Sequence, residues 1–192
     1  MFGRGGRPSG LSATVPHAIG ALNFLADRPD IDPARIGAMG FSWGGGLSMR
    51  IASTRESRQV DHPDRKFAAH VAFYPVCWSF SGEGPPGRDV SLGQMTGAPM
   101  LVLAGEKDDY DRPDSCPKFR TSVHESYRDA ITVHVFPGAT HKWDAGVDET
   151  FVDPNAYLGR GGTVTVRSNR QVREESRKMS VDFFRRVFAM GG

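Results

Sequence analysis

The stretch GAMGFSWGGG holds Ser42 between Gly40 and Gly44. A serine hydroxyl attacks a carbonyl only when a base removes its proton and the side chain projects from the backbone. A tight turn between a strand and a helix supplies that projection, and it requires small residues two positions before and after the serine. The same turn leaves the N–H of Trp43 at a helix N-terminus, where it can donate to a developing oxyanion. The glycines would equally suit a turn that only packs a helix against a strand.

An acid and a base follow this serine along the chain. The stretch LAGEKDDYD carries Asp108 and Asp109, and the stretch FPGATHKWD carries His141. Each begins with apolar residues, so the polar side chains stand directly after an expected strand. The order serine, acid, histidine is typical of parallel sheets that carry a nucleophilic serine. His141 would take the proton of Ser42, and a carboxylate would orient the imidazole and stabilise its cation.

The elements that must position these groups alternate along the chain. Short apolar runs typical of buried strands alternate with segments of helical period. We expect strands within 34–41, 66–75, 98–105 and 131–138, and helices within 15–26, 45–53, 116–130 and 171–189. This alternation predicts an α/β fold with a mostly parallel sheet flanked by helices. The segments 79–96 and 144–170, rich in glycine, proline and charge, are expected to be surface excursions.

The residues directly after each strand would share one rim of this sheet, because ligands bind outside the carboxyl ends of parallel strands. Trp43, Trp78 and Trp143 all fall on that rim. Trp78 and Trp143 are therefore candidates for substrate binding in an apolar pocket, although large side chains that pack beneath loops would fall at the same positions. Cys77 and Cys116 border the rim and form either a disulfide or two reduced thiols.

Composition restricts the class of protein. The 192 residues suit one domain, 1–192, in which 1–12 are expected to be disordered. A formal charge of +2 without a concentrated basic face argues against a nucleic-acid partner. No apolar run approaches the roughly 20 residues of a membrane span, and the first residues lack the apolar stretch of a signal peptide. We expect a cytoplasmic protein, exported only if a missing N-terminal segment carries a signal.

The remaining polar residues predict no metal and no cofactor. His70 and His134 lie inside apolar runs, as core or sheet-face histidines do, and the other histidines have no partners at metal-ligand spacing. Asp111 and Asp114 extend an acidic run, but this run lacks the alternating ligands and terminal glutamate of a calcium loop. We expect a solvated loop there.

Three stretches resemble the dienelactone hydrolase family of α/β-hydrolases: DPARIGAMGFSWGG, APMLVLAGEKDDY and VHVFPGATHKWD. The resemblance implies the α/β-hydrolase fold with Ser42 as nucleophile, Asp108 as acid and His141 as base. The position of the acid in the family pattern favours Asp108 over the adjacent Asp109. It further implies hydrolysis of a small-molecule carboxylic ester or lactone through an acyl-enzyme. Typical members carry a cysteine nucleophile where this chain has serine, so the implied chemistry is ester or lactone hydrolysis in general.

The chain departs from the family pattern before the serine turn. The family fold has several strands there, whereas this chain has a helix and a polar terminus. The second oxyanion donor comes from a loop after one of those strands, and without them the strand within 34–41 would be an exposed sheet edge. The sequence therefore predicts a fold lacking its first strands, either as a truncated hydrolase or as a homodimer that pairs through this edge. For the isolated chain we expect dimerisation or low solubility.

Two alternative functions fit the same residues. A non-catalytic or truncated hydrolase-fold module would bind ligand in the cleft without turnover. A serine peptidase of the same fold would need entrance loops or an extra domain for peptides, and a chain of 192 residues offers little room for them.

Overall fold

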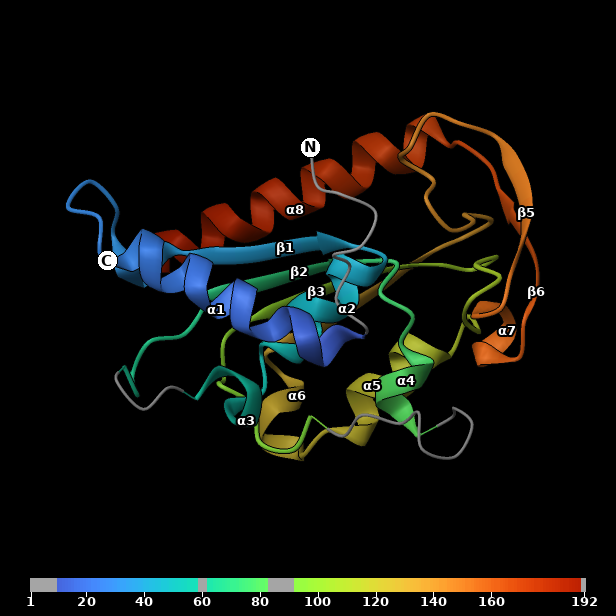
Figure 1. Cartoon of the computed structure of the whole chain (residues 1–192). Helices are drawn as coiled ribbons and strands as arrows, with labels where there is room; N and C mark the ends of the chain where they lie inside the picture. The colour runs from blue at the N-terminus through green and yellow to red at the C-terminus, as the bar shows by residue number, and fades with distance from the viewer. Residues whose placement is uncertain (1–9, 59–61, 83–91, 191–192) are drawn as a thin grey trace, which may run out of the picture.

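Four parallel strands form the central sheet of the protein (Figure 1). The computed structural model describes residues 10–58, 62–82 and 92–190. The strands lie side by side in chain order and are β1 (Gly37–Phe41), β2 (Ala69–Phe73), β3 (Met100–Gly105) and β4 (Ile131–Phe136). Every neighbouring pair is parallel. The predicted α/β class with a mostly parallel sheet is confirmed.

Helices cover both faces of the sheet (Figure 1). The long helix α8 (Arg170–Met190) lies along one face, and α2 (Trp43–Arg50) and α5 (Ser115–Ser122) pack on the other. Helix α1 (Leu11–Ala26) packs beside α2. The shorter helices in the connections are η1 (Pro33–Arg35), α3 (Thr54–Ser57), α4 (Trp78–Ser81) and α6 (Glu125–Arg128).

The two central strands are apolar along their whole length because helices cover both of their faces. Every residue of β2 and β3 is buried. Val71 and Leu101 pack in the layer under α8, whereas Ala72 and Val102 pack in the opposite layer with Met49 of α2. Alternate side chains of each strand thus serve opposite layers, which explains why these strands read as continuous apolar runs.

The single helix expected over 116–130 is instead two helices. Helix α5 ends before Val123, whose backbone is extended, and α6 begins after His124. The His124 side chain accepts a hydrogen bond from the N–H of Ser126, so it caps α6. Apolar residues recur at helical spacing on both sides of this cap, and the pattern alone therefore predicts one helix.

The segment 144–170 is also more ordered than the sequence predicts. It contains a two-stranded antiparallel hairpin of β5 (Glu149–Asp153) and β6 (Gly162–Val166), with the short helix α7 (Ala156–Gly159) between them. Val164 and Val166 are buried in a small cluster with Ala156, against which Phe151 and Tyr110 pack. The hairpin lies beyond the carboxyl ends of the sheet strands (Figure 1). It therefore borders the rim on which the candidate site residues were expected.

The N-terminal expectation needs one correction. Residues 10–12 were expected to be disordered, but Gly10 is the N-cap of α1 and the two residues after it form the first turn of that helix, whose Leu11 packs against the core beside α2. The rest of the expected disordered segment, 1–9, lies outside the described residues. In the expected excursion 79–96, residues 79–81 belong to α4, and Met95 forms an isolated bridge with Ser53.

Strand β1 lies at one edge of the sheet described here. Its Met39 and Phe41 side chains are 53% and 42% exposed, which is unusual for large apolar residues on a strand. The exposed edge expected from the sequence is therefore present in the described residues, and its pairing with a second copy stays a prediction. Among the same residues, no helix is both long enough and apolar enough to span a bilayer.

Burial of His70 predicts a pH-dependent stability. The ring lies inside β2 with no exposed surface, and burial lowers its pKa from 6.5 to about 4, with the Ser48 backbone acting in the opposite sense. As pH falls between these two values, the unfolded chain binds a proton that the folded chain does not, so the free energy of unfolding falls. We expect a loss of about 2 kcal/mol from this group between about pH 7 and pH 5.

The His70→Leu variant removes this loss. Urea denaturation at both pH values should show a drop in unfolding free energy that is smaller in the variant than in the wild type by about 2 kcal/mol. An equal drop in the two proteins would contradict the assignment.

Candidate active site

Ser42 sits at the turn between β1 and α2 in a strained backbone conformation. Its φ of 50° lies in the left-handed region, where non-glycine residues are rare. Its N–H donates to the carbonyl of Phe73 at 2.9 Å, which holds the turn against β2. A Cβ at Gly40 would overlap the backbone carbonyl of Gly44, so glycine is required at position 40. A Cβ at Gly44 would meet nothing within 4 Å, so alanine would fit there as well as glycine.

The structure brings Ser42, His141 and Asp108 into one hydrogen-bonded chain. The Nε2 atom of His141 lies 2.9 Å from the Ser42 Oγ, and its Nδ1 lies 2.7 Å from the Asp108 Oδ2. Because a carboxylate only accepts, Nδ1 carries the ring proton and Nε2 is free to accept from the serine hydroxyl. His141 and Asp108 are 2% and 6% exposed, so these two members of the relay lie away from water, whereas Ser42 is partly exposed.

Asp109 makes different contacts from its neighbour. Its carboxylate accepts hydrogen bonds from the N–H of Thr165 at 2.8 Å and from the Tyr157 hydroxyl at 3.4 Å. It therefore holds the β5–β6 hairpin against the loop after β3. Of the two adjacent acids considered from the sequence, Asp108 is the one that contacts His141.

Trp43 contributes its backbone rather than its ring to this site. It is the first residue of α2 and follows Ser42 directly, so its N–H is one of the helix N-terminal groups without an intrahelical acceptor. The Trp43 ring is 52% exposed. The geometry expected for an oxyanion donor, an amide at a helix N-terminus next to the serine, is present.

The two other tryptophans do not form an open pocket. Trp143 has no exposed surface, and its indole nitrogen donates to the Ser176 hydroxyl of α8 at 3.2 Å. It belongs to the core beneath the site, and the substrate-binding role expected for it is wrong. Trp78 is 5% exposed and thus offers substrate almost no surface either. Rim position in the sequence does not distinguish a side chain that points outward from one that packs beneath the rim.

An apolar groove of about 380 Å³ lies beside the edge strand instead. Met39, Phe41, Phe73, Val181 and Phe184 supply its apolar walls, and Asp144 and Arg173 stand among its polar ones. Phe41 immediately precedes the candidate nucleophile. A larger cavity of about 650 Å³, lined by residues of 54–58, 63–66 and 94–96, includes none of the three relay residues.

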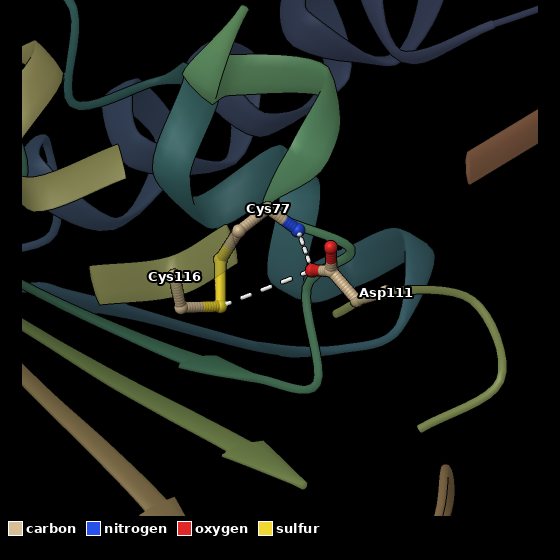
Figure 2. A group of neighbouring side chains, drawn as sticks. All are labelled: Cys77, Asp111 and Cys116. Carbon is tan, nitrogen blue, oxygen red and sulfur yellow. Dashed lines mark hydrogen bonds between the residues drawn. A yellow bond between two sulfur atoms is a disulfide. The ribbon is translucent and has the colours of Figure 1, made fainter. Parts of the chain in front are cut away.

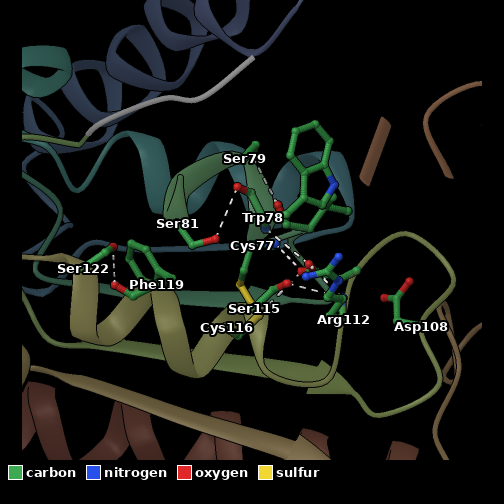
Figure 3. The surroundings of a disulfide bond; sticks show 12 residues. Cys77, Trp78, Ser79, Ser81, Asp108, Arg112, Ser115, Cys116, Phe119 and Ser122 are labelled. Atoms are coloured by element: carbon green, nitrogen blue, oxygen red, sulfur yellow. Dashed lines mark hydrogen bonds between the residues drawn. A yellow bond between two sulfur atoms is a disulfide. The ribbon is translucent and has the colours of Figure 1, made fainter. Parts of the chain in front are cut away.

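Cys77 and Cys116 form a disulfide that joins the loop after β2 to the start of α5 (Figure 2). The bridge spans 39 residues of sequence, for which the loop-entropy model gives about 4 kcal/mol of stabilisation. Figure 3 shows the surroundings of this bridge, including Arg112 and Asp108 from the loop after β3. Of the two states that the sequence left open for these cysteines, the structure has the disulfide. The bridge braces the loop that carries Asp108.

Asp111 lies next to this disulfide and is not the solvated residue that its acidic surroundings suggest. Its carboxylate accepts hydrogen bonds from the N–H groups of Cys77, Trp78 and Arg112. Burial raises its pKa to about 7, against the opposing effect of a hydrogen bond with Ser115. Asp114, by contrast, is exposed and pairs with Lys118 at 2.8 Å.

Ligand atoms of Cys77, Asp111 and Cys116 lie within 4.8 Å of one another (Figure 2). The two sulfur atoms are bonded to each other, however, and a disulfide has no thiolate to bind a metal. This cluster therefore braces the loops and does not form a metal centre.

Two tyrosines beside His141 were not among the site residues predicted from the sequence. Tyr74 directly follows β2, and Tyr110 stands two residues after Asp108. Their rings contact the His141 ring with centroid separations of 4.7 Å and 4.5 Å. Tyr74 directly follows a strand and Tyr110 lies in the same loop as Asp108, and these positions are the one signal that would have drawn attention to them.

Known structures share this fold at low sequence identity. Esterase 2 of Thermogutta terrifontis, phosphoramylated by tabun, matches with a TM-score of 0.64 at 15% identity over 94% of this chain and 67% of its own. A dienelactone hydrolase-like promiscuous phosphotriesterase from metagenomic libraries matches with a TM-score of 0.55 at 18% identity over 92% of this chain and 61% of its own. An alpha-beta serine hydrolase homologue from Coxiella burnetii matches with a TM-score of 0.54 at 21% identity, over 75% of this chain and 58% of its own.

The fold is thus that of the α/β-hydrolases. The model of the dienelactone hydrolase family matches residues 8–188, and the chain belongs to that family. A search of functionally curated proteins finds no match. The chain spans 67% of the first of these three structures and less than two thirds of the other two.

Proposed function

We propose that this chain hydrolyses carboxylic esters or lactones of small molecules through an acyl-enzyme on Ser42. The observation that carries this proposal is the continuous relay from the Ser42 Oγ through His141 to Asp108, with separations of 2.9 Å and 2.7 Å. Membership of the dienelactone hydrolase family supports the reaction class.

The first half of the proposed reaction forms the acyl-enzyme. The Ser42 Oγ bonds to the substrate carbonyl carbon while its proton moves to the His141 Nε2, which makes the imidazole a cation. Asp108 stabilises this cation through the hydrogen bond at Nδ1. The carbonyl oxygen becomes an oxyanion, to which the N–H of Trp43 donates. As the intermediate collapses, the bond to the leaving alkoxide breaks and His141 returns the proton to it.

The second half repeats these steps with water. His141 accepts a proton from water as the water oxygen bonds to the acyl carbon, and the Ser42 Oγ leaves with that proton. For a lactone, the leaving alkoxide is part of the same molecule, so the product is one hydroxy acid. The strained backbone at Ser42 supports this role because such strain is frequent at nucleophilic serines on strand-to-helix turns.

Reaction with a fluorophosphonate probe and turnover of a short-chain p-nitrophenyl ester test this proposal together. We expect one probe molecule per chain, attached to the tryptic peptide that contains Ser42, and ester hydrolysis that falls in proportion to labelling. Labelling at another residue, or hydrolysis that survives complete labelling of Ser42, would contradict the proposal. Protection from the probe by ester ligands without any turnover would favour the non-catalytic alternative.

A further inference from the structure

The imidazole of His141 lies between two tyrosine rings that come from different loops. Tyr74 stands at the end of β2 and Tyr110 in the loop after β3, and their ring centroids lie 4.7 Å and 4.5 Å from that of His141. Both separations are shorter than the roughly 6 Å within which the face of an aromatic ring attracts a cation, and the two rings meet the imidazole at interplanar angles of 61° and 51°. Because His141 is 2% exposed, hardly any water is available to solvate a charge on its ring.

A carboxylate anchors each tyrosine at its far end. The Tyr74 hydroxyl donates to the Asp144 Oδ1 at 2.6 Å, and the Tyr110 hydroxyl donates to the Asp153 Oδ2 at 2.8 Å. Burial, and then these hydrogen bonds, raise the pKa of both phenols above the ordinary value. The two hydroxyls therefore stay protonated donors, and donation to an anion makes each ring more electron-rich.

The backbone at Tyr74 also points to a fixed ring position. Its φ of 37° is in the left-handed region, which is strained for an aromatic residue. Its N–H donates to the carbonyl of Leu103 at 2.7 Å, and its ring also packs on the Trp143 ring at 4.8 Å. Strained backbone persists only where surrounding contacts hold it, so the structure specifies this ring position closely.

We propose that Tyr74 and Tyr110 are positioning residues that stabilise the protonated His141 ring. This inference rests on the proposed function, in which the proton leaves the Ser42 Oγ, the Oγ–carbon bond forms, and His141 holds the proton until the alkoxide takes it. The two electron-rich rings attract the imidazolium during that interval, and their contacts fix the plane of the imidazole between Ser42 and Asp108.

The charged groups around His141 are consistent with a cation at this position. Asp108 contacts the ring directly, while Asp144 and Asp153 lie behind the two phenols. Lys142, the next residue in the chain, pairs with Glu149 of the hairpin at 2.7 Å, so a carboxylate balances its charge.

Variants of Tyr110 test the proposal because this residue is less buried than Tyr74. We expect Tyr110→Leu to lower the midpoint of the His141 titration, followed by NMR of the ring C–H signals, by about one pH unit, and kcat/KM for a p-nitrophenyl ester by about tenfold. Tyr110→Phe keeps the ring, so both quantities should stay within about threefold, or half a pH unit, of the wild type. An unshifted midpoint in a folded Leu variant would overturn the proposal.

Fluorinated phenylalanines at position 110 keep the shape of the ring while withdrawing its electrons. We expect the titration midpoint to fall stepwise as fluorine atoms are added, a trend that a purely structural role would not produce. The matched control is Tyr157→Leu, which removes a ring that contacts Asp109 and should leave the midpoint unchanged. A midpoint that does not respond to fluorine would overturn the proposal even if Tyr110→Leu failed to fold.

The NMR titration also separates this inference from the proposed function. Midpoints that shift as expected in a protein without ester turnover would contradict the function and leave the tyrosine–imidazole interaction standing. Normal turnover with unshifted midpoints would contradict the tyrosine–imidazole interaction and leave the proposed function standing.

Discussion

The Ser42→Ala variant is expected to lose ester hydrolysis by about 10⁶-fold in kcat, because no other group can form the acyl-enzyme at the end of the relay. Ser42 alone lies within hydrogen-bonding distance of the His141 Nε2 among the residues that the structure describes. The residual rate would come from binding and from the proposed oxyanion donor, the N–H of Trp43. Steady-state hydrolysis of a p-nitrophenyl ester measures the loss, and circular dichroism checks that the fold is intact.

Ser79→Ala is the matched control for this variant. Ser79 belongs to α4, and its hydroxyl donates to the carbonyl of Val76 three residues earlier. We expect its activity to stay within about twofold of the wild type, as for most surface substitutions. Ser42→Ala with substantial activity would mean that hydrolysis proceeds without this nucleophile, and the proposed mechanism would be wrong.

Asp108→Asn is expected to lower kcat by about 10⁴-fold while leaving the fold intact. The carboxylate accepts the Nδ1 proton of His141 at 2.7 Å and so keeps Nε2 available to the serine. An asparagine can present its amide N–H to the same nitrogen, which favours the wrong tautomer and removes the charge that balances the imidazolium. The pH dependence of kcat/KM, compared in both proteins, measures the effect.

The adjacent Asp109→Asn variant provides a control one residue away. Its hydrogen bonds go to Thr165 and Tyr157 of the hairpin segment. We expect a loss of about 1 kcal/mol in stability, because a charged acceptor is replaced by a neutral one, and a change in kcat of less than about fivefold. A large loss of activity in Asp109→Asn together with a small one in Asp108→Asn would exchange the roles of the two acids.

The sheet could be predicted from sequence because buried parallel strands leave a strong local pattern. Strands β2 and β3 are covered on both faces, so every position is apolar and each run is distinct from the amphipathic helices between them. The hairpin of β5 and β6 carries no such pattern. Buried and exposed residues are mixed along both of its strands. The hairpin is held in place by contacts between residues far apart in the chain, such as the hydrogen bond from the Thr165 N–H to Asp109.

The proximity of Ser42, Asp108 and His141 followed from sequence for a related reason. Ser42 directly follows β1, and Asp108 and His141 lie in the loops after β3 and β4. The carboxyl ends of parallel strands meet at one rim, so chain position predicts nearness in space. Nearness does not determine direction, however. Trp143 shares the rim by position, yet its ring turns into the core against Tyr74 and α8.

The sequence by itself determined the order of the four sheet strands, the main helices between them and the turn at Ser42, because these depend on local period and on the space available at Gly40. Only the tertiary structure decided which acid contacts His141, that the two cysteines pair, and that tyrosines flank the imidazole. The physical reason is the distance along the chain over which each effect acts. The spacing of apolar residues and the backbone conformation of a turn depend on neighbours within a few residues. Side-chain direction and burial instead depend on packing between loops that are tens of residues apart in the chain.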